Sequence, residues 1–233
     1  MELFCEYSTV SSFYTDEDIY KCEVIGINRI ASNGRVLNIH GTHPDGKSNA
    51  DVNTLTIFDH QIENFPRYLC NFFPNLKSIS VLCCGLKKLS KFDFIGCEGI
   101  EKLMLNGNLI KSVAPDVFEY ASNLEIISFF MNQISFVPEI VFDGLKMLKY
   151  VNFKMNPGID WCCKELGRQR NLLAEIKEKL RKDFDAKQVI GSDENGTQEF
   201  FEAFKFLENF RDSARIAMED NCDNRIKMMF NRL

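Results

Sequence analysis

Three histidines and nine cysteines are the residues of this sequence whose types could do chemistry. His40 and His43 stand close together in HGTH, and His60 follows further along the chain. Such residues could hold a zinc ion, but no Cys/His spacing typical of a zinc site surrounds them. We interpret them as ordinary histidines, His40 and His43 lying in a loop at the end of a strand, and predict no metal.

The cysteines offer a second possible chemistry, because a Cys–His pair can act as a nucleophile when the thiol is ionised. Several of the nine lie near the chain ends, a distribution that favours disulfide-stapled ends and an oxidising compartment. The odd count leaves at least one thiol unpaired or bonded to another chain. The sequence has neither a phosphate-binding loop nor a dinucleotide fingerprint. We therefore predict that the protein is not an enzyme and needs no cofactor. The cysteines are Cys5, Cys22, Cys70, Cys83, Cys84, Cys97, Cys162, Cys163 and Cys222.

Composition excludes several classes of protein. The chain has 233 residues, 45% of them hydrophobic and 26% charged, with a formal charge of −5, which argues against a nucleic-acid surface. No apolar run is long enough for a transmembrane helix, so we predict no membrane insertion. The opening MELFCEYSTV does not have the pattern of a signal peptide. Either the protein is cytosolic, or its signal is not part of this sequence.

The elements that position these residues follow from an internal repeat of 24 residues. In GIEKLMLNGNLIKSV, the apolar residues Ile100, Leu103, Leu105 and Ile110 are spaced neither as in a helix nor as in a two-faced strand. The same pattern recurs one period upstream and downstream without insertion. Counting from the first residue of each repeat, we predict buried side chains at positions 1, 4, 6, 11, 14, 19 and 22. Position 1 is Val52, Leu76, Ile100, Leu124 and Leu148.

This pattern, L-x-x-L-x-L-x-x-N/C-x-L with a late Phe, resembles the leucine-rich-repeat family in its 24-residue extracellular form. The N-terminal cysteine pair, the DVNTLTI entry and FFPNL also resemble small secreted insect leucine-rich-repeat proteins. The resemblance implies an α/β solenoid, with a curved parallel sheet on its concave side. It also implies a polar ladder at position 9 that satisfies backbone groups in the turns. The ladder residues are His60, Cys84, Asn108, Asn132 and Asn156. His60 departs from the pattern, so we expect a weaker ladder in the first repeat.

The resemblance also divides the chain into three regions. Residues 1–51 are predicted to be a β-rich N-terminal cap, stapled by Cys5 and Cys22. Residues 52–159 hold five repeats, which start at 52, 76, 100, 124 and 148. Residues 160–233 have helical spacing and are predicted to be a C-terminal helical cap or extension.

The remaining predictions concern other cysteines and one modification site. In related C-terminal caps an N-P start is followed by paired cysteines, so we expect Cys222 to pair with Cys162 or with its neighbour Cys163. We interpret Cys70 and Cys97 as two buried thiols in preference to a bridge. Asn195-Gly196-Thr197 is a glycosylation sequon, which a secreted protein would use.

The strand positions that point away from the core are predicted to line the concave face. Many of them are apolar or aromatic, which is typical of an interaction surface. The alternatives are that the C-terminal helices cover part of this face, or that these are scattered surface residues. The predicted binding residues are Phe58, Leu82, Lys102, Met104, Asn106, Ile126, Phe130, Met131, Tyr150 and Lys154.

We therefore predict a non-enzymatic protein-binding module, secreted or extracellular, whose partner lies on the concave face. One alternative is an intracellular leucine-rich-repeat adaptor with reduced cysteines. The other is a small-ligand carrier or enzyme that uses the C-terminal helical region. The ligand and the oligomeric state are left open.

Overall fold

A computed structural model describes residues 1–11, 18–29, 33–164 and 172–189. Residues Met1–Gln188 form one compact unit. The second unit, Val189–Leu233, lies outside the described residues except for Val189 itself. The part of the predicted helical region beyond residue 189 and the sequon at Asn195 therefore fall outside the described residues.

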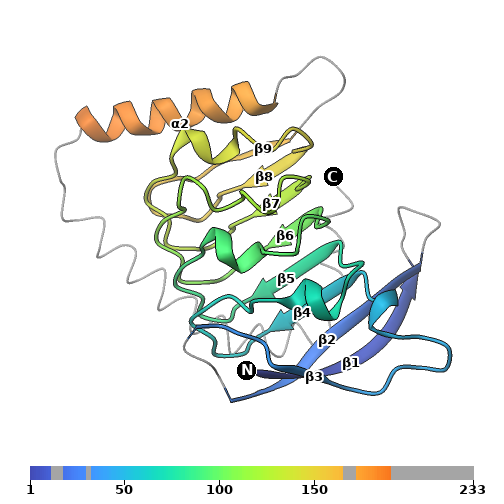
Figure 1. Cartoon of the computed structure of the whole chain (residues 1–233). Coiled ribbons are helices and arrows are strands. Elements are labelled where there is room, and N and C mark those ends of the chain that lie inside the picture. Colours follow the sequence, from blue (N-terminus) through green and yellow to red (C-terminus); the bar gives the residue numbers. More distant parts are fainter. Residues whose placement is uncertain (12–17, 30–32, 165–171, 190–233) are drawn as a thin grey trace. The chain divides into compact units, whose positions relative to one another are not determined.

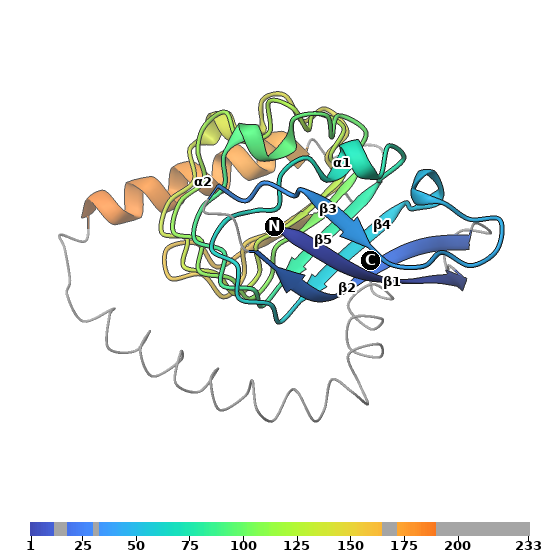
Figure 2. The same ribbon diagram turned by 60° about the horizontal axis from the view of Figure 1, so that its bottom comes forward.

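One nine-stranded sheet organises the first unit, in the order β3-β1-β2-β4-β5-β6-β7-β8-β9. Figure 1 shows its strands stacked one above another, and Figure 2 shows the N-terminal strands from below. The cap strands are β1 (Glu2–Ser11), β2 (Asp18–Asn28) and β3 (Asn38–His40). The repeat strands are β4 (Thr54–Phe58), β5 (Ser78–Leu82), β6 (Lys102–Met104), β7 (Ile126–Ser128) and β8 (Tyr150–Asn152).

The register of the repeat strands is the 24-residue period itself. Neighbouring strands from β4 to β8 are parallel, and Thr54, Ser78, Lys102, Ile126 and Tyr150 lie side by side. Positions 1, 4 and 6 are buried in all five repeats, and positions 11, 14, 19 and 22 are buried in the first four. The predicted solenoid fold is confirmed. One repeat cannot bury its own apolar face, so stacking is what creates the core.

The return segments contain short helical turns and a continuous line of aromatic rings. The turns are α1 (Leu69–Phe72), η2 (Lys91–Phe94) and η3 (Glu139–Phe142). Ring centroids from Phe65 through Phe94, Phe118, Phe129 and Phe153 to Trp161 are 5.1–6.5 Å apart. These separations lie in the range preferred by aromatic pairs, and they account for part of the high phenylalanine content.

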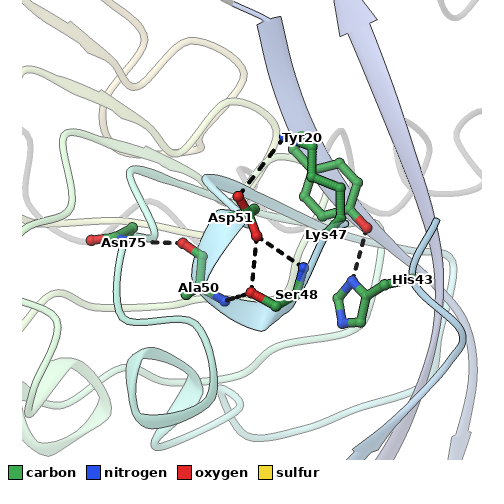
Figure 3. Close-up of polar contacts among 7 residues, drawn as sticks. All are labelled: Tyr20, His43, Lys47, Ser48, Ala50, Asp51 and Asn75. Atoms are coloured by element: carbon green, nitrogen blue, oxygen red, sulfur yellow. Dashed lines mark hydrogen bonds and ion pairs between the residues drawn. The ribbon is translucent and has the colours of Figure 1, made fainter. Parts of the chain in front are cut away.

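A polar and aromatic cluster joins the N-terminal cap to the first repeat (Figure 3). The Tyr20 hydroxyl lies 2.8 Å from His43 Nδ1, and His43 Nε2 lies 2.8 Å from Asn49 Oδ1. Since an amide oxygen only accepts, His43 Nε2 carries the proton and Nδ1 accepts from Tyr20. The Tyr7 ring stacks on His43 at 3.8 Å. Asn75 Nδ2 then donates to Ala50 O at 2.8 Å, which ties the repeats to η1 (Asn49–Asp51).

We predict that this cluster makes the fold sensitive to alkaline pH. Burial raises the pKa of Tyr7 to about 12, with a smaller contribution from Tyr20, and burial also raises the pKa of Tyr20. Because the unfolded tyrosines ionise near their ordinary pKa of about 10 and the folded ones later, the unfolded state releases protons first. The contribution of the two tyrosines to stability should be constant below pH ~10 and should fall between pH ~10 and pH ~12.

Denaturant titrations at a series of pH values would measure this loss. Tyr7→Phe should make the alkaline decline shallower, because it removes one of the two groups. A free energy of unfolding that stays flat through the alkaline range in the wild type would contradict the prediction.

The C-terminal end differs from the sequence prediction in one respect. Residues after Ile159 first form β9 (Cys162–Lys164), which pairs antiparallel with β8, and only then α2 (Leu172–Val189). The prediction that residues from 160 are helical is therefore wrong at its start, because a strand satisfies the open edge of β8. Ile176 and Leu180 of α2 are buried in the core.

Polar contacts also hold α2 against the last repeats. Trp161 Nε1 donates to Asp183 at 2.7 Å. Arg181 donates to both oxygens of Glu139, at 3.1 and 2.9 Å. The helix thus covers the end of the apolar core, as a solenoid requires.

Candidate functional site

The candidate site is the face of the repeat sheet that points away from the core, which we call the concave face. Side chains at positions 4 and 6 are buried, so those at positions 3, 5 and 7 point to the other side. Backbone pairing continues past the assigned strands. Asp59 N donates to Leu82 O, Cys83 N to Asn106 O, Gly107 N to Phe130 O and Met131 N to Lys154 O. Position 7 therefore belongs to the same ordered sheet.

All ten predicted binding residues keep access to solvent. Phe58, Lys102 and Lys154 are exposed, and the other seven are half-buried. Half-buried apolar side chains on a sheet face are suited to contact a partner, because little further ordering is needed when they bind. The structure thus brings these ten residues to one face of the sheet.

Two position-5 residues differ from the expectation that this whole row is accessible. Ser128 and Asn152 are only 1% and 3% exposed. Ser128 Oγ donates to Asn106 Oδ1 at 2.7 Å, and Asn152 Oδ1 accepts from Lys154 N at 2.9 Å. These two polar side chains are held in place below their larger neighbours on the face. A partner would therefore contact the neighbours and not Ser128 or Asn152.

Position 8, immediately after the strand, is left-handed in every repeat. The φ angles of Asp59, Cys83, Gly107, Met131 and Met155 are between +54° and +71°. Only glycine adopts this conformation without cost. A Cβ added at Gly107 would lie 2.7 Å from Cys83 Sγ, so a larger residue there would force the Cys83 side chain to move.

The position-9 ladder fixes the turns beneath this face. Asn132 Nδ2 donates to Leu105 O at 2.8 Å and to Phe129 O at 3.1 Å, while its Oδ1 accepts from Ile110 N at 3.2 Å. Asn108 and Asn156 make the corresponding bonds in their own repeats.

The first two ladder positions use other chemistry. Cys84 Sγ donates to Leu82 O at 3.1 Å and lies 3.6 Å from Ile57 O. Burial raises the pKa of the Cys84 thiol to about 12, so it remains a protonated donor and is no nucleophile at neutral pH. His60 Nε2 lies 3.0 Å from Val24 O of β2, which extends the ladder into the cap through a single side-chain contact.

Two disulfides lie within the described residues. Cys5 and Cys22 are bonded and join β1 to β2. Cys70 and Cys97 are also bonded, with their Cα atoms 5.3 Å apart, so the interpretation of these two as buried thiols is wrong. Positions 19 and 22 are ordinary core positions where a thiol could pack alone. The signal that could have predicted the bond is that both of these core positions are occupied by cysteine in two neighbouring repeats.

Other predicted cysteine pairs remain untested. Cys162 and Cys163 lie in β9, but Cys222 is outside the described residues, and so is their expected bond.

The three histidines lie apart from one another and are engaged separately. His40 stacks on Phe4 with ring centroids 4.7 Å apart, His43 belongs to the cap cluster, and His60 contacts β2. Within the described ranges, no group of three or more His, Cys, Asp or Glu residues could hold a metal ion.

Comparison with known proteins identifies the repeats. The family model named leucine rich repeat matches residues 98–157. The chain carries leucine-rich repeats. A curated relative, leucine-rich repeat-containing G-protein coupled receptor 5 of Rattus norvegicus, is 25% identical over 113 residues, or 48% of this chain and 12% of the receptor.

A solved structure of the Toll–Spatzle complex, a molecular hub in Drosophila development and innate immunity, also matches. It is 21% identical, has a TM-score of 0.43, and covers 52% of this chain and 17% of that chain. Both relatives are therefore much longer than this leucine-rich-repeat chain. Over the described ranges, no helix is both long and apolar enough to span a membrane.

Proposed function

We propose that this chain is a non-enzymatic, extracellular binding module that recognises a protein through its concave face. The observation that carries the proposal is the set of accessible apolar side chains on consecutive strands, which includes Phe58 at 37% exposure. Contiguous accessible apolar area is typical of interaction surfaces. Leucine-rich-repeat relatives that include a receptor and a Toll complex agree with a protein partner.

The rigidity of the face supports this use. The outer side chains stand on backbone that is hydrogen-bonded across five parallel strands and held from beneath by the asparagine ladder. A partner that binds such a surface does not have to order loops first, so less of its binding free energy is lost.

The two disulfides support an extracellular location. Disulfides persist in oxidising compartments and are rare in the cytosol. Cys5–Cys22 and Cys70–Cys97 are both largely buried, as expected for structural bonds. The alternative of an intracellular adaptor requires these four cysteines to be reduced thiols, which does not agree with the two bonds.

A comparative capture experiment tests the proposal. Immobilised wild-type protein, a Phe130→Asp/Tyr150→Asp variant and an Ile140→Asp/Met147→Asp control would be exposed to extracellular fluid from the source tissue. Ile140 and Met147 are 58% and 51% exposed and lie in the fourth repeat outside its concave positions, so the control matches the added charge. We expect a partner that the control retains and the concave variant loses. Retention of every partner by the concave variant would contradict the proposal.

A further inference from the structure

The concave face carries an uncompensated positive charge over repeats three to five. Lys102 and Lys154 are exposed, and neither makes an ion pair with any residue of the described ranges. By contrast, the lysines at position 2 are paired, Lys77 with Glu101 at 2.8 Å and Lys149 with Glu125 at 2.7 Å. Positions 3, 5, 7 and 8 of these three repeats contain no acidic residue.

The first acidic residue that follows β8 in the sequence is Asp160, and its carboxylate already accepts a backbone hydrogen bond. Asp160 accepts the backbone N–H of Met155 at 2.8 Å. It therefore holds the turn in place and is not paired with Lys154. Among the residues that the structure describes, no carboxylate pairs with either concave lysine.

Apolar side chains fill the area between the two lysines. Lys102 is at position 3 of the third repeat and Lys154 at position 7 of the fifth, so they occupy opposite corners. Two strand spacings and four residues along a strand place them roughly 16 Å apart at their backbones. Met104, Ile126 and Phe130 lie within this area, all half-buried.

Two strained methionines extend the apolar area along one edge. Met131 and Met155 adopt φ angles of 56° and 62°, a conformation that is unfavourable for a long side chain. Gly107 shows that the same turn forms with glycine. Met155 is 53% exposed and gains little from packing, so the strain is not offset by burial there. The left-handed turn recurs in all five repeats, and in the last two it places a methionine beside the concave face.

We infer that the partner presents a segment with two acidic groups flanking apolar side chains, seated diagonally across repeats three to five. The lysines attract and orient the acidic groups, and Phe130 with the two methionines contacts the apolar ones. This inference rests on the proposed function and adds the chemistry of the partner.

Peptide selection tests the inference without knowledge of the natural ligand. The probe is a phage-displayed library of random peptides roughly twelve residues long, enough to span the patch in an extended conformation. Wild-type protein should select peptides with two Asp or Glu residues about five positions apart and apolar residues between them. A Lys102→Glu/Lys154→Glu variant should bind these peptides at least about tenfold more weakly, and should select Lys or Arg instead. A Lys88→Glu/Lys146→Glu control, exposed and away from the concave positions, should behave as the wild type.

Methionine variants give a second readout that a structural role would not produce. Met131→Gly and Met155→Gly should each raise the melting temperature, since glycine relieves the left-handed strain. The same changes should weaken peptide binding several-fold. Unchanged binding together with higher stability would overturn the role given to the methionines.

The outcomes distinguish a failure of the concave-face proposal from a failure of the inferred partner chemistry. If Phe130→Asp leaves selected peptides bound, or no Phe130-dependent binder is found, the concave-face proposal itself fails. If Phe130→Asp abolishes binding but the peptides show no acidic preference and charge reversal has no effect, only the inferred partner chemistry is wrong.

Discussion

Asn132→Ala should lower the free energy of unfolding by about 2–4 kcal/mol. Asn132 is 3% exposed, and its amide bonds two carbonyl groups of different repeats as well as the Ile110 N–H. Alanine would leave the Ile110 N–H buried without a partner. Leu105 O and Phe129 O would each lose one bond but would still accept from Asn108 and Asn156. A buried donor without a partner costs about 1–3 kcal/mol, and the two lost bonds add to this cost.

Guanidinium titrations with the disulfides intact would measure the change. Asn123→Ala is the matched control, because Asn123 is exposed and its amide donates only to Glu98 O at 2.9 Å. The control should lose less than about 1 kcal/mol. If Asn132→Ala were no more destabilising than the control, the ladder would not be what holds the turns beneath the concave face.

Removal of the Cys70–Cys97 bond should also have a large effect on stability. The bond closes a loop with a sequence separation of 27, and loop-closure entropy predicts a loss of roughly 3–4 kcal/mol in the Cys70→Ala/Cys97→Ala variant. It links α1 of the first repeat to the second repeat, where the ladder is formed by His60 and Cys84 instead of asparagine. A covalent link is thus present where the amide ladder is absent.

Mass measurement on protein from its native source provides the direct test of this bond. Alkylation without reductant should leave Cys70 and Cys97 unmodified, and alkylation after reduction should modify both. A double variant with wild-type stability would contradict the energetic claim. Full alkylation of both cysteines without reductant would contradict both the bond and the extracellular proposal.

Much of the fold could be predicted from the sequence because the repeat is strict. Residues such as Leu103, Leu105 and Ile110 recur at fixed spacing without insertion, and fixed spacing is what allows each strand to pair with the next in register. The accessible positions followed from strand alternation once the buried ones were assigned.

Other features depend on packing in three dimensions and left little signal in the sequence. The Cys70–Cys97 bond required knowledge that the return segments of two repeats approach closely. The burial of Ser128 depends on the size of its neighbours on adjacent strands. Met131 adopts a left-handed φ, but the sequence has no glycine at this position from which that conformation could be predicted. Strand β9 pairs with β8 although its residues lie outside the repeat.

Site-directed photo-crosslinking tests the central claim, that the concave face binds a protein, most directly. A photoreactive side chain would replace Phe130 or Tyr150 on the concave face, and Ile140 or Met147 elsewhere in the repeats, in the full chain added to native extracellular fluid. The account predicts one discrete protein adduct from the two concave positions and none from the other two. Adducts of equal yield from all four positions, or from Ile140 and Met147 alone, would contradict it.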